Sequence, residues 1–137
     1  CLDRGLGEAN SHYRHAFALG RYSQGLSIAK ALKMGIAGKV RAYICTRGPR
    51  GVVIHAEGKT LDVPPAHERR VTDPTGCGDA FRAGLIFGIE KGHDWLTIGR
   101  MGNLMGALKV EHPGTQNQRF DYDEFSEQFR QQFGYSL

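Results

Sequence analysis

The stretch Val71–Gly84, VTDPTGCGDAFRAG, places three small residues, Gly76, Cys77 and Gly78, directly before Asp79 at the apparent start of a helix. Glycine weakens a helix interior, so we expect these residues just outside it, where the first backbone N–H groups lack an intrahelical partner. Such N–H groups at the positive end of the helix dipole favour an anion. The spacing therefore predicts an anion hole that holds a transferring phosphoryl group.

Asp79 has two interpretations on this spacing. A carboxylate beside an anion hole can take the proton of an attacking hydroxyl while the hole holds the phosphoryl group. The same carboxylate can simply stabilise the N-terminus of the helix, an effect of about 0.3–1 kcal/mol. The spacing alone leaves both interpretations open.

Two glycine-containing stretches look like nucleotide motifs but do not satisfy them. Gly58–Thr60 matches the end of a P-loop, but position 53 is Val53 rather than the required glycine, so a hairpin turn is the simpler interpretation. A dinucleotide fingerprint that starts at Gly76 needs a glycine at position 81, which is Phe81.

The composition is that of an ordinary globular domain, with 40% hydrophobic and 23% charged residues in 137. No apolar run approaches the roughly 18 residues of a membrane span. The net charge of +4 is spread along the chain without interleaved aromatic residues, so we expect no nucleic-acid partner. Three widely spaced cysteines without a CxxC pair favour a reducing, cytoplasmic setting. The oligomeric state is not readable, and a homodimer is left open.

The hydrophobic pattern predicts strands followed by helices, which is typical of an α/β layer in which helices cover a sheet. The predicted strands are Val40–Cys45, Gly51–Ala56 and Thr60–Val63. The predicted helices are Ser27–Met34, one around Phe81–Ile89, Asp94–Val110 and Tyr122–Phe133, the last with a capping box at Asp121 and Glu124. Gly99, Gly102 and Gly106 thin one side of the third of these helices, which lets another segment approach closely.

The residues Asp73–Gly84, DPTGCGDAFRAG, resemble the C-terminal signature of the PfkB family of sugar and nucleoside kinases, D-T-T-G-A-G-D-A-F-x-A-G. Pro74 and Cys77 replace its second and fifth residues. This variant, with Arg82 and the later stretch Gly114–Asn117, is most similar to a bacterial branch of adenosine-kinase-like or PfkB-type carbohydrate kinases.

A second stretch, Thr46–Gly51 (TRGPRG), is similar to the family's T-x-G-x-x-G, which follows a strand and contacts the nucleotide. The resemblance covers about residues 40–137. It implies the C-terminal portion of a ribokinase-like α/β fold, with helices packed on a mostly parallel sheet. Residues 1–38 are then an unmatched segment, and residues 39–137 the nucleotide-binding part.

The resemblance also implies an activity: transfer of the ATP γ-phosphoryl group, with magnesium, to a primary alcohol of a nucleoside such as adenosine, or of a sugar. It assigns roles to particular residues: the base is Asp79; the anion hole is Gly76, Cys77 and Gly78; the nucleotide contacts are Thr46, Gly48, Gly51 and Asn103; and a potassium-type cation site is Asp73, Thr75 and Gly114. Simpler roles stay open, namely a hairpin turn for the glycines, a surface amide for Asn103 and bracing of the turn for Asp73 and Thr75.

The chain also departs from the family pattern. The family's Asn-x-x-Glu, which helps to organise magnesium, is absent, since Asn10 is followed at that distance by Tyr13. The Gly-Gly substrate motif and the lid are absent too, and the chain begins with Cys1, which indicates a fragment. Two functions therefore remain: an ATP-dependent kinase of which this is the C-terminal part, and a non-catalytic, truncated nucleotide-binding module.

Overall fold

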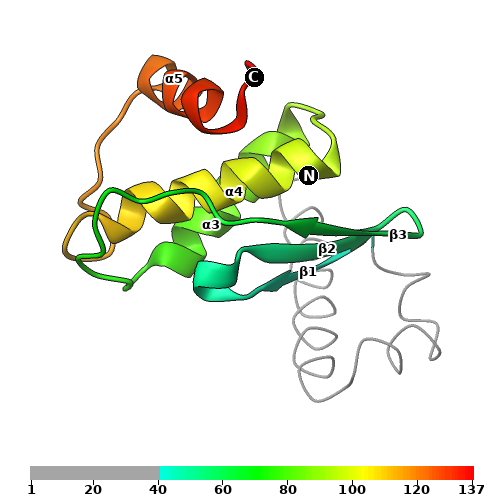
Figure 1. Ribbon diagram of the computed structural model, residues 1–137, viewed down its shortest axis with the longest axis horizontal. Coiled ribbons are helices and arrows are strands. Elements are labelled where there is room, and N and C mark those ends of the chain that lie inside the picture. The colour runs from blue at the N-terminus through cyan, green and yellow to red at the C-terminus, as the bar shows by residue number, and fades with distance from the viewer. Residues whose placement is uncertain (1–40) are drawn as a thin grey trace, which may run out of the picture. The chain divides into compact units, whose positions relative to one another are not determined.

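Three strands and three α-helices make up the described part of the computed structural model, residues 41–137 (Figure 1). In chain order the elements are β1 (Ala42–Thr46), a short 3-10 helix η2 (Gly48–Arg50), β2 (Val52–Ala56), β3 (Lys59–Val63), α3 (Cys77–Glu90), α4 (Trp95–Val110) and α5 (Tyr122–Phe133). The helix predicted at Ser27–Met34 lies outside the described residues. The three strands and the last two helices therefore match the predicted elements to within about two residues, the usual uncertainty of an element boundary.

The strands form one sheet in the order β1-β2-β3. β2 and β3 pair antiparallel, from Val52 opposite Val63 to Ala56 opposite Lys59. The two-residue turn between them, Glu57 and Gly58, has positive φ at both positions (53° and 72°), the geometry that suits a tight hairpin. The sequence predicts a mostly parallel sheet, and this pair differs because a two-residue turn can join only antiparallel strands.

The helix α4 packs between the sheet and α3, and its glycines allow the close approach that the sequence predicts. A Cβ atom added at Gly99 would lie 2.9 Å from Ile54 Cδ1 of the sheet. One added at Gly102 would lie 2.7 Å from Cε2 of Phe81, on α3. The two glycines thus let α4 contact a different neighbour on each side, whereas an added Cβ at Gly106 meets only one atom, at 3.8 Å.

At its N-terminus α4 is fixed to the hairpin. Asp94 caps it by accepting hydrogen bonds from the backbone N–H groups of Leu96 and Thr97 at 2.9 and 3.1 Å. Trp95 Nε1 donates to a carboxylate oxygen of Glu57 in the β2–β3 turn at 3.2 Å. The first turn of α4 and the tip of the hairpin are therefore held together.

The helix α5 closes the core over the other side of α4. The predicted capping box is present, because Asp121 accepts from the Glu124 N–H and the Glu124 carboxylate accepts from the Asp121 N–H. Phe125 and Phe129 are buried against α4 in a cluster that comprises Ala66, Met101, Leu104, Ala107, Leu108, Phe125 and Phe129. The helix ends at Gly134, whose φ of 82° suits glycine.

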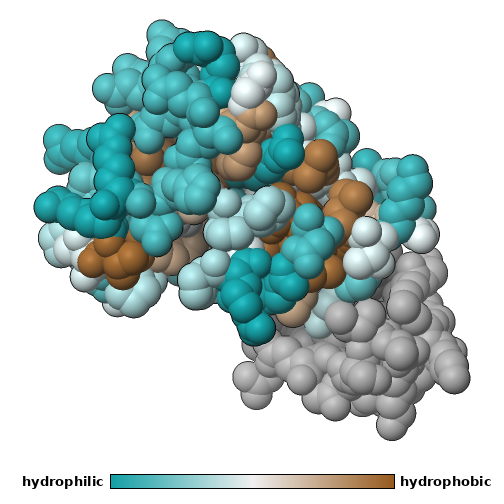
Figure 2. Space-filling model, in the orientation of Figure 1, coloured by the Kyte–Doolittle hydropathy of each residue, from teal (hydrophilic) through white to brown (hydrophobic). Residues whose placement is uncertain are grey.

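Most of the face drawn in Figure 2 is hydrophilic, with one group of hydrophobic residues over the strands and a separate group at the lower left. Among residues 41–137, the large apolar side chains that are exposed are Val71, Ile86, Ile89 and Tyr122. No helix in that range is both long and apolar enough to cross a bilayer.

Candidate functional site

A cavity of about 400 Å³ lies where the β1–β2 turn, the start of α3 and the second half of α4 meet. Its lining includes six of the residues that the sequence singles out: Thr46, Gly48, Gly51, Cys77, Gly78 and Asn103. The remaining lining is largely apolar, with prolines, alanines, valines and Phe81. This size and composition are typical of a site for a small organic ligand with a few polar anchor points.

The β1–β2 turn, Thr46–Gly51, is rigid because of its own hydrogen bonds. Arg47 N–H donates to the Gly51 carbonyl at 2.8 Å, and Gly51 N–H donates to the Gly48 carbonyl at 3.0 Å. Gly51 has φ 80°, and a Cβ there would lie 2.2 Å from the Val63 carbonyl oxygen. Backbone geometry alone therefore requires a glycine at position 51, whether or not the turn also contacts a ligand.

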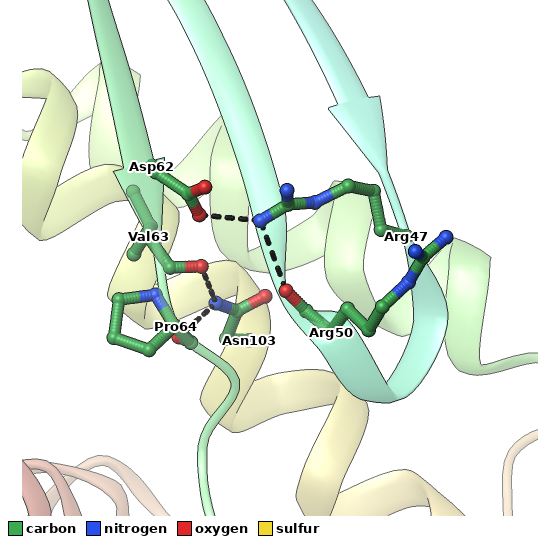
Figure 3. A network of polar contacts seen from close by, with 6 residues as sticks. All are labelled: Arg47, Arg50, Asp62, Val63, Pro64 and Asn103. Carbon is green, nitrogen blue, oxygen red and sulfur yellow. Dashed lines mark hydrogen bonds and ion pairs between the residues drawn. The ribbon is translucent and has the colours of Figure 1, made fainter.

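The turn is also attached to β3 through a charged side chain (Figure 3). The Arg47 guanidinium forms an ion pair with Asp62 and donates to the Arg50 carbonyl at 3.0 Å. The side chain of Arg47 is 28% exposed, so this pair is partly shielded from solvent. The backbone of the turn is consequently held in one conformation beside the cavity.

Asn103 connects α4 to the end of β3 (Figure 3). Its Nδ2 donates to the Pro64 carbonyl at 2.7 Å and reaches the Val63 carbonyl at 3.4 Å. These contacts fix the amide so that Nδ2 faces the strand, while the residue still lines the cavity. The predicted contact of Asn103 with the nucleotide base stays a prediction, and the amide oxygen is the atom left to make it.

The helix α3 begins at Cys77, earlier than predicted, and Gly76 is its N-cap with φ 85°. The Cys77 N–H donates to the Pro74 carbonyl at 3.1 Å, and the Asp79 and Ala80 N–H groups donate to the Gly76 carbonyl. In the described structure, the N–H groups of Gly76 and Gly78 have no hydrogen-bond partner. Two of the three backbone N–H groups of the predicted anion hole are thus available, and that of Cys77 is used within the turn.

Asp79 lies in the first turn of α3 with its side chain 81% exposed. Its Oδ1 accepts from Arg82 Nη1 at 2.6 Å, and the Arg82 side chain is itself 72% exposed. An exposed ion pair one helical turn apart contributes only about 0–1 kcal/mol. The carboxylate is therefore accessible and weakly paired.

Burial raises the pKa of the neighbouring Cys77 thiol, which stays protonated near neutral pH.

Asp73 brings together the residues of the predicted cation site. Its Oδ1 accepts from the Thr75 N–H at 2.9 Å and its Oδ2 from the Gly114 N–H at 2.8 Å. Hydrogen bonds from Thr75 and Gly114, with the nearby Lys109 charge, lower the pKa of Asp73 to about 2. A Cβ added at Gly76 would lie 2.9 Å from the Thr115 carbonyl oxygen, so the two segments also touch directly.

Sequence reasoning overlooks Lys109, which is completely buried in the last turn of α4. Its Nζ donates to the Asp73 carbonyl at 3.0 Å and to the His112 carbonyl at 2.9 Å. The sequence contains one indication that Lys109 is buried: it directly follows Leu108, on the side of α4 that packs into the core. A lysine on such a face needs partners for its charge.

In the part of the chain that is described, no group of three or more histidine, cysteine, aspartate or glutamate side chains is arranged to hold a metal ion. Both carboxylate oxygens of Asp73 already accept backbone N–H groups. These residues do not form a set of magnesium ligands.

A family model described as pfkB family carbohydrate kinase matches residues 17–121, well over half of the chain. The chain belongs to this family. The match starts at residue 17, within the segment 1–38, so the family resemblance extends further towards the N-terminus than the expected residues 40–137.

The most informative relatives are nucleoside kinases. The chain is 35% identical over 89 residues to the nucleoside kinase of Methanocaldococcus jannaschii, covering 65% of this chain and 30% of that protein. It is 31% identical over 137 residues to the nucleoside kinase of Methanothermobacter thermautotrophicus, covering 98% and 42%. The solved structure of Burkholderia thailandensis nucleoside kinase in complex with inosine matches with a TM-score of 0.72 and 48% identity, over 74% of this chain and 34% of that one.

These matches confirm the ribokinase-like α/β fold predicted from the sequence. The chain spans 30% and 42% of the length of the two relatives and 34% of the length of the solved enzyme. A large part of each relative therefore has no counterpart in this chain.

Proposed function

We propose that the protein is an ATP-dependent kinase that phosphorylates a hydroxyl of a nucleoside or sugar, and that this chain forms the nucleotide-facing part of its site. The observation that carries the proposal is the cavity that joins the β1–β2 turn, Asn103 and the start of α3. Family membership and the nucleoside kinase relatives support it. Because the Burkholderia enzyme was solved with inosine and with ADP-inosine, we favour a nucleoside, adenosine included, as the acceptor.

Two parts of the cavity suit the two ends of a nucleotide, the base and the phosphates. The apolar lining and the amide oxygen of Asn103 receive the base, and the rigid β1–β2 turn shapes the wall beside it. The N–H groups of Gly76 and Gly78, which have no hydrogen-bond partner among residues 41–137, lie at the positive end of α3 and hold the phosphoryl group during transfer. Magnesium, whose ligands the described residues do not form, would neutralise phosphate charge when bound.

Asp79 acts as the general base in this proposal. The acceptor oxygen attacks the γ-phosphorus, its proton passes to the Asp79 carboxylate, and the bond from the phosphorus to the β-phosphate oxygen breaks to release ADP. The carboxylate is accessible to an acceptor, and its contact with Arg82 is an exposed ion pair that costs little to break.

A non-catalytic nucleotide-binding module is the second candidate. The outward-facing, Arg82-paired Asp79 favours it, since a base in position is expected to face the anion hole.

The replacement Asp79→Asn distinguishes the two candidates. In the full-length protein we expect turnover to fall by roughly 10²–10⁴-fold with ATP binding unchanged, because a general base is lost while the cavity is kept. Asp123→Asn, an exposed aspartate in the first turn of α5, is the matched control. Calorimetry with ATP and magnesium, followed by phosphotransfer assays on adenosine, inosine and sugars, provides the measurements.

Each outcome has a definite meaning. Near-normal turnover in the Asp79 variant removes this residue from the mechanism. ATP binding without transfer to any acceptor supports the binding module, and absence of ATP binding refutes the assignment of the cavity.

A further inference from the structure

The Lys109 ammonium lies between two segments that flank the candidate site. One acceptor, the Asp73 carbonyl, belongs to the stretch that enters α3, and the other, the His112 carbonyl, belongs to the stretch that follows α4. The side chain is wholly buried, so these bonds are made away from water. Burial of an ammonium is costly, and these two hydrogen bonds, with the charge of the nearby Asp73 carboxylate, offset part of that cost.

The same two segments carry the residues of the predicted potassium-type site, Asp73, Thr75 and Gly114. Backbone carbonyl oxygens are the ligands that potassium takes in proteins. An ammonium carries the same single charge and binds the same oxygens. Since two carbonyls of this region already accept hydrogen bonds from Nζ, a potassium ion placed there would meet a like charge at close range.

We propose that the Lys109 ammonium takes the place of a bound monovalent cation, so that this protein transfers the phosphoryl group without potassium. This inference rests on the proposed kinase function. The residues therefore do not fit the potassium ion that the sequence predicts, and the charge is supplied by the chain itself.

Several contacts show what the ammonium holds together. The N–H groups of Thr72 and Asp73 both donate to the Val110 carbonyl, at 2.8 and 3.0 Å. The Gly114 N–H donates to the Asp73 carboxylate, and Gly76 lies against Thr115. Lys109 adds a charged link to this set. It is a positioning residue, because it fixes the turn whose N–H groups face the phosphoryl group.

The native protein provides the first test, which needs no variant. Phosphotransfer by the full-length protein is measured in potassium, sodium and choline buffers of equal ionic strength, and we expect equal rates. In parallel, thallous ion, a stand-in for potassium, is added to the same full-length protein and followed by thallium-205 NMR, and we expect no site-bound resonance. Saturable activation by potassium, or a bound thallous resonance, would overturn the proposal.

The replacement Lys109→Met provides the second test, because it removes the charged Nζ and frees the Asp73 and His112 carbonyls, while the rest of the side chain still fills the core. We expect turnover of this variant to fall in sodium and to recover in potassium, and potassium to raise its melting temperature, as a ligand of the folded state does. Lys59→Met, at an exposed position at the start of β3, is the control and gains no potassium response. A folded Lys109 variant that is equally impaired in both salts shows a purely structural lysine and refutes the proposal.

These measurements distinguish a failure of this proposal from a failure of the proposed kinase function. If the full-length protein transfers phosphoryl groups and needs potassium, the function stands and the role of Lys109 is wrong. If no acceptor is phosphorylated, the proposed function fails, and a bound thallous ion would independently refute the cation replacement.

Discussion

The two sides of the candidate site are built very differently. On the side of the β1–β2 turn, hydrogen bonds fix the side chains of Arg47 and Asn103, and Arg47 also forms an ion pair. The backbone at Gly51 lies too close to the end of β3 to leave room for a side chain. On the side of α3, the Asp79 carboxylate is 81% exposed and paired only with Arg82. The wall of the cavity at the β1–β2 turn is therefore held by contacts among the described residues, whereas the Asp79 carboxylate is held there only by an exposed ion pair.

The largest effect is expected from Gly51→Ala, which disrupts the rigid β1–β2 turn. The new Cβ would meet the Val63 carbonyl and the residue would keep a strained positive φ, so we expect a loss of about 2–5 kcal/mol in the free energy of unfolding and weaker ATP binding. Gly58→Ala is the control, because φ is 72° there but nothing lies near the new Cβ. It should cost about 1–2 kcal/mol. Equal losses in urea titrations of the two variants would show that the close approach is unimportant.

An intermediate effect is expected from Asp73→Asn, on the α3 side, which changes the link between the stretch that enters α3 and the stretch that follows α4. The folded-state pKa of about 2 lies below the roughly 3.9 of an unfolded aspartate, so the ionised carboxylate stabilises the fold above pH 4. That contribution is lost as the pH falls through about 2. We expect the variant to melt several degrees below the native chain at pH 7, and the gap to narrow on acidification. A gap independent of pH would exclude the carboxylate as its cause.

The smallest effect is expected from Arg82→Ala, on the exposed side. Its ion pair with Asp79 is open to solvent, so the free energy of unfolding should change by less than about 1 kcal/mol, whatever the salt concentration. Urea titrations at low and high salt provide the measurement. A clearly larger loss would mean that Arg82 stabilises the start of α3 and that Asp79 is less available than it looks.

Local features of the fold are predictable from the sequence. The hairpin at Glu57 and Gly58 and the capping box at Asp121 and Glu124 each depend on residues a few positions apart. The start of α3 is predicted less well, because Gly78 is tolerated in a first turn where N–H groups need no helical partner. The family resemblance carries the rest of the site prediction, and six of the residues to which it assigns roles do line one cavity.

Long-range contacts are what the sequence does not reveal. The bond from the Gly114 N–H to Asp73 spans 41 positions, and that from Lys109 to Asp73 spans 36. A lysine near the end of a helix is normally placed in solvent, since its charge suits the C-terminal dipole. Only the arrangement of carbonyls in space shows that Lys109 is buried and donates to two of them.

The contact between Trp95 and Glu57 gives the chain a built-in optical probe. Trp95 is the sole tryptophan among the 137 residues, and it precedes Asn103 on α4 by eight positions, or about 12 Å along the axis. Its indole is attached to the hairpin end remote from the cavity. The fluorescence emission of Trp95 therefore reports when the hairpin separates from α4 during denaturation. The same emission should change little when a nucleotide enters at the opposite end.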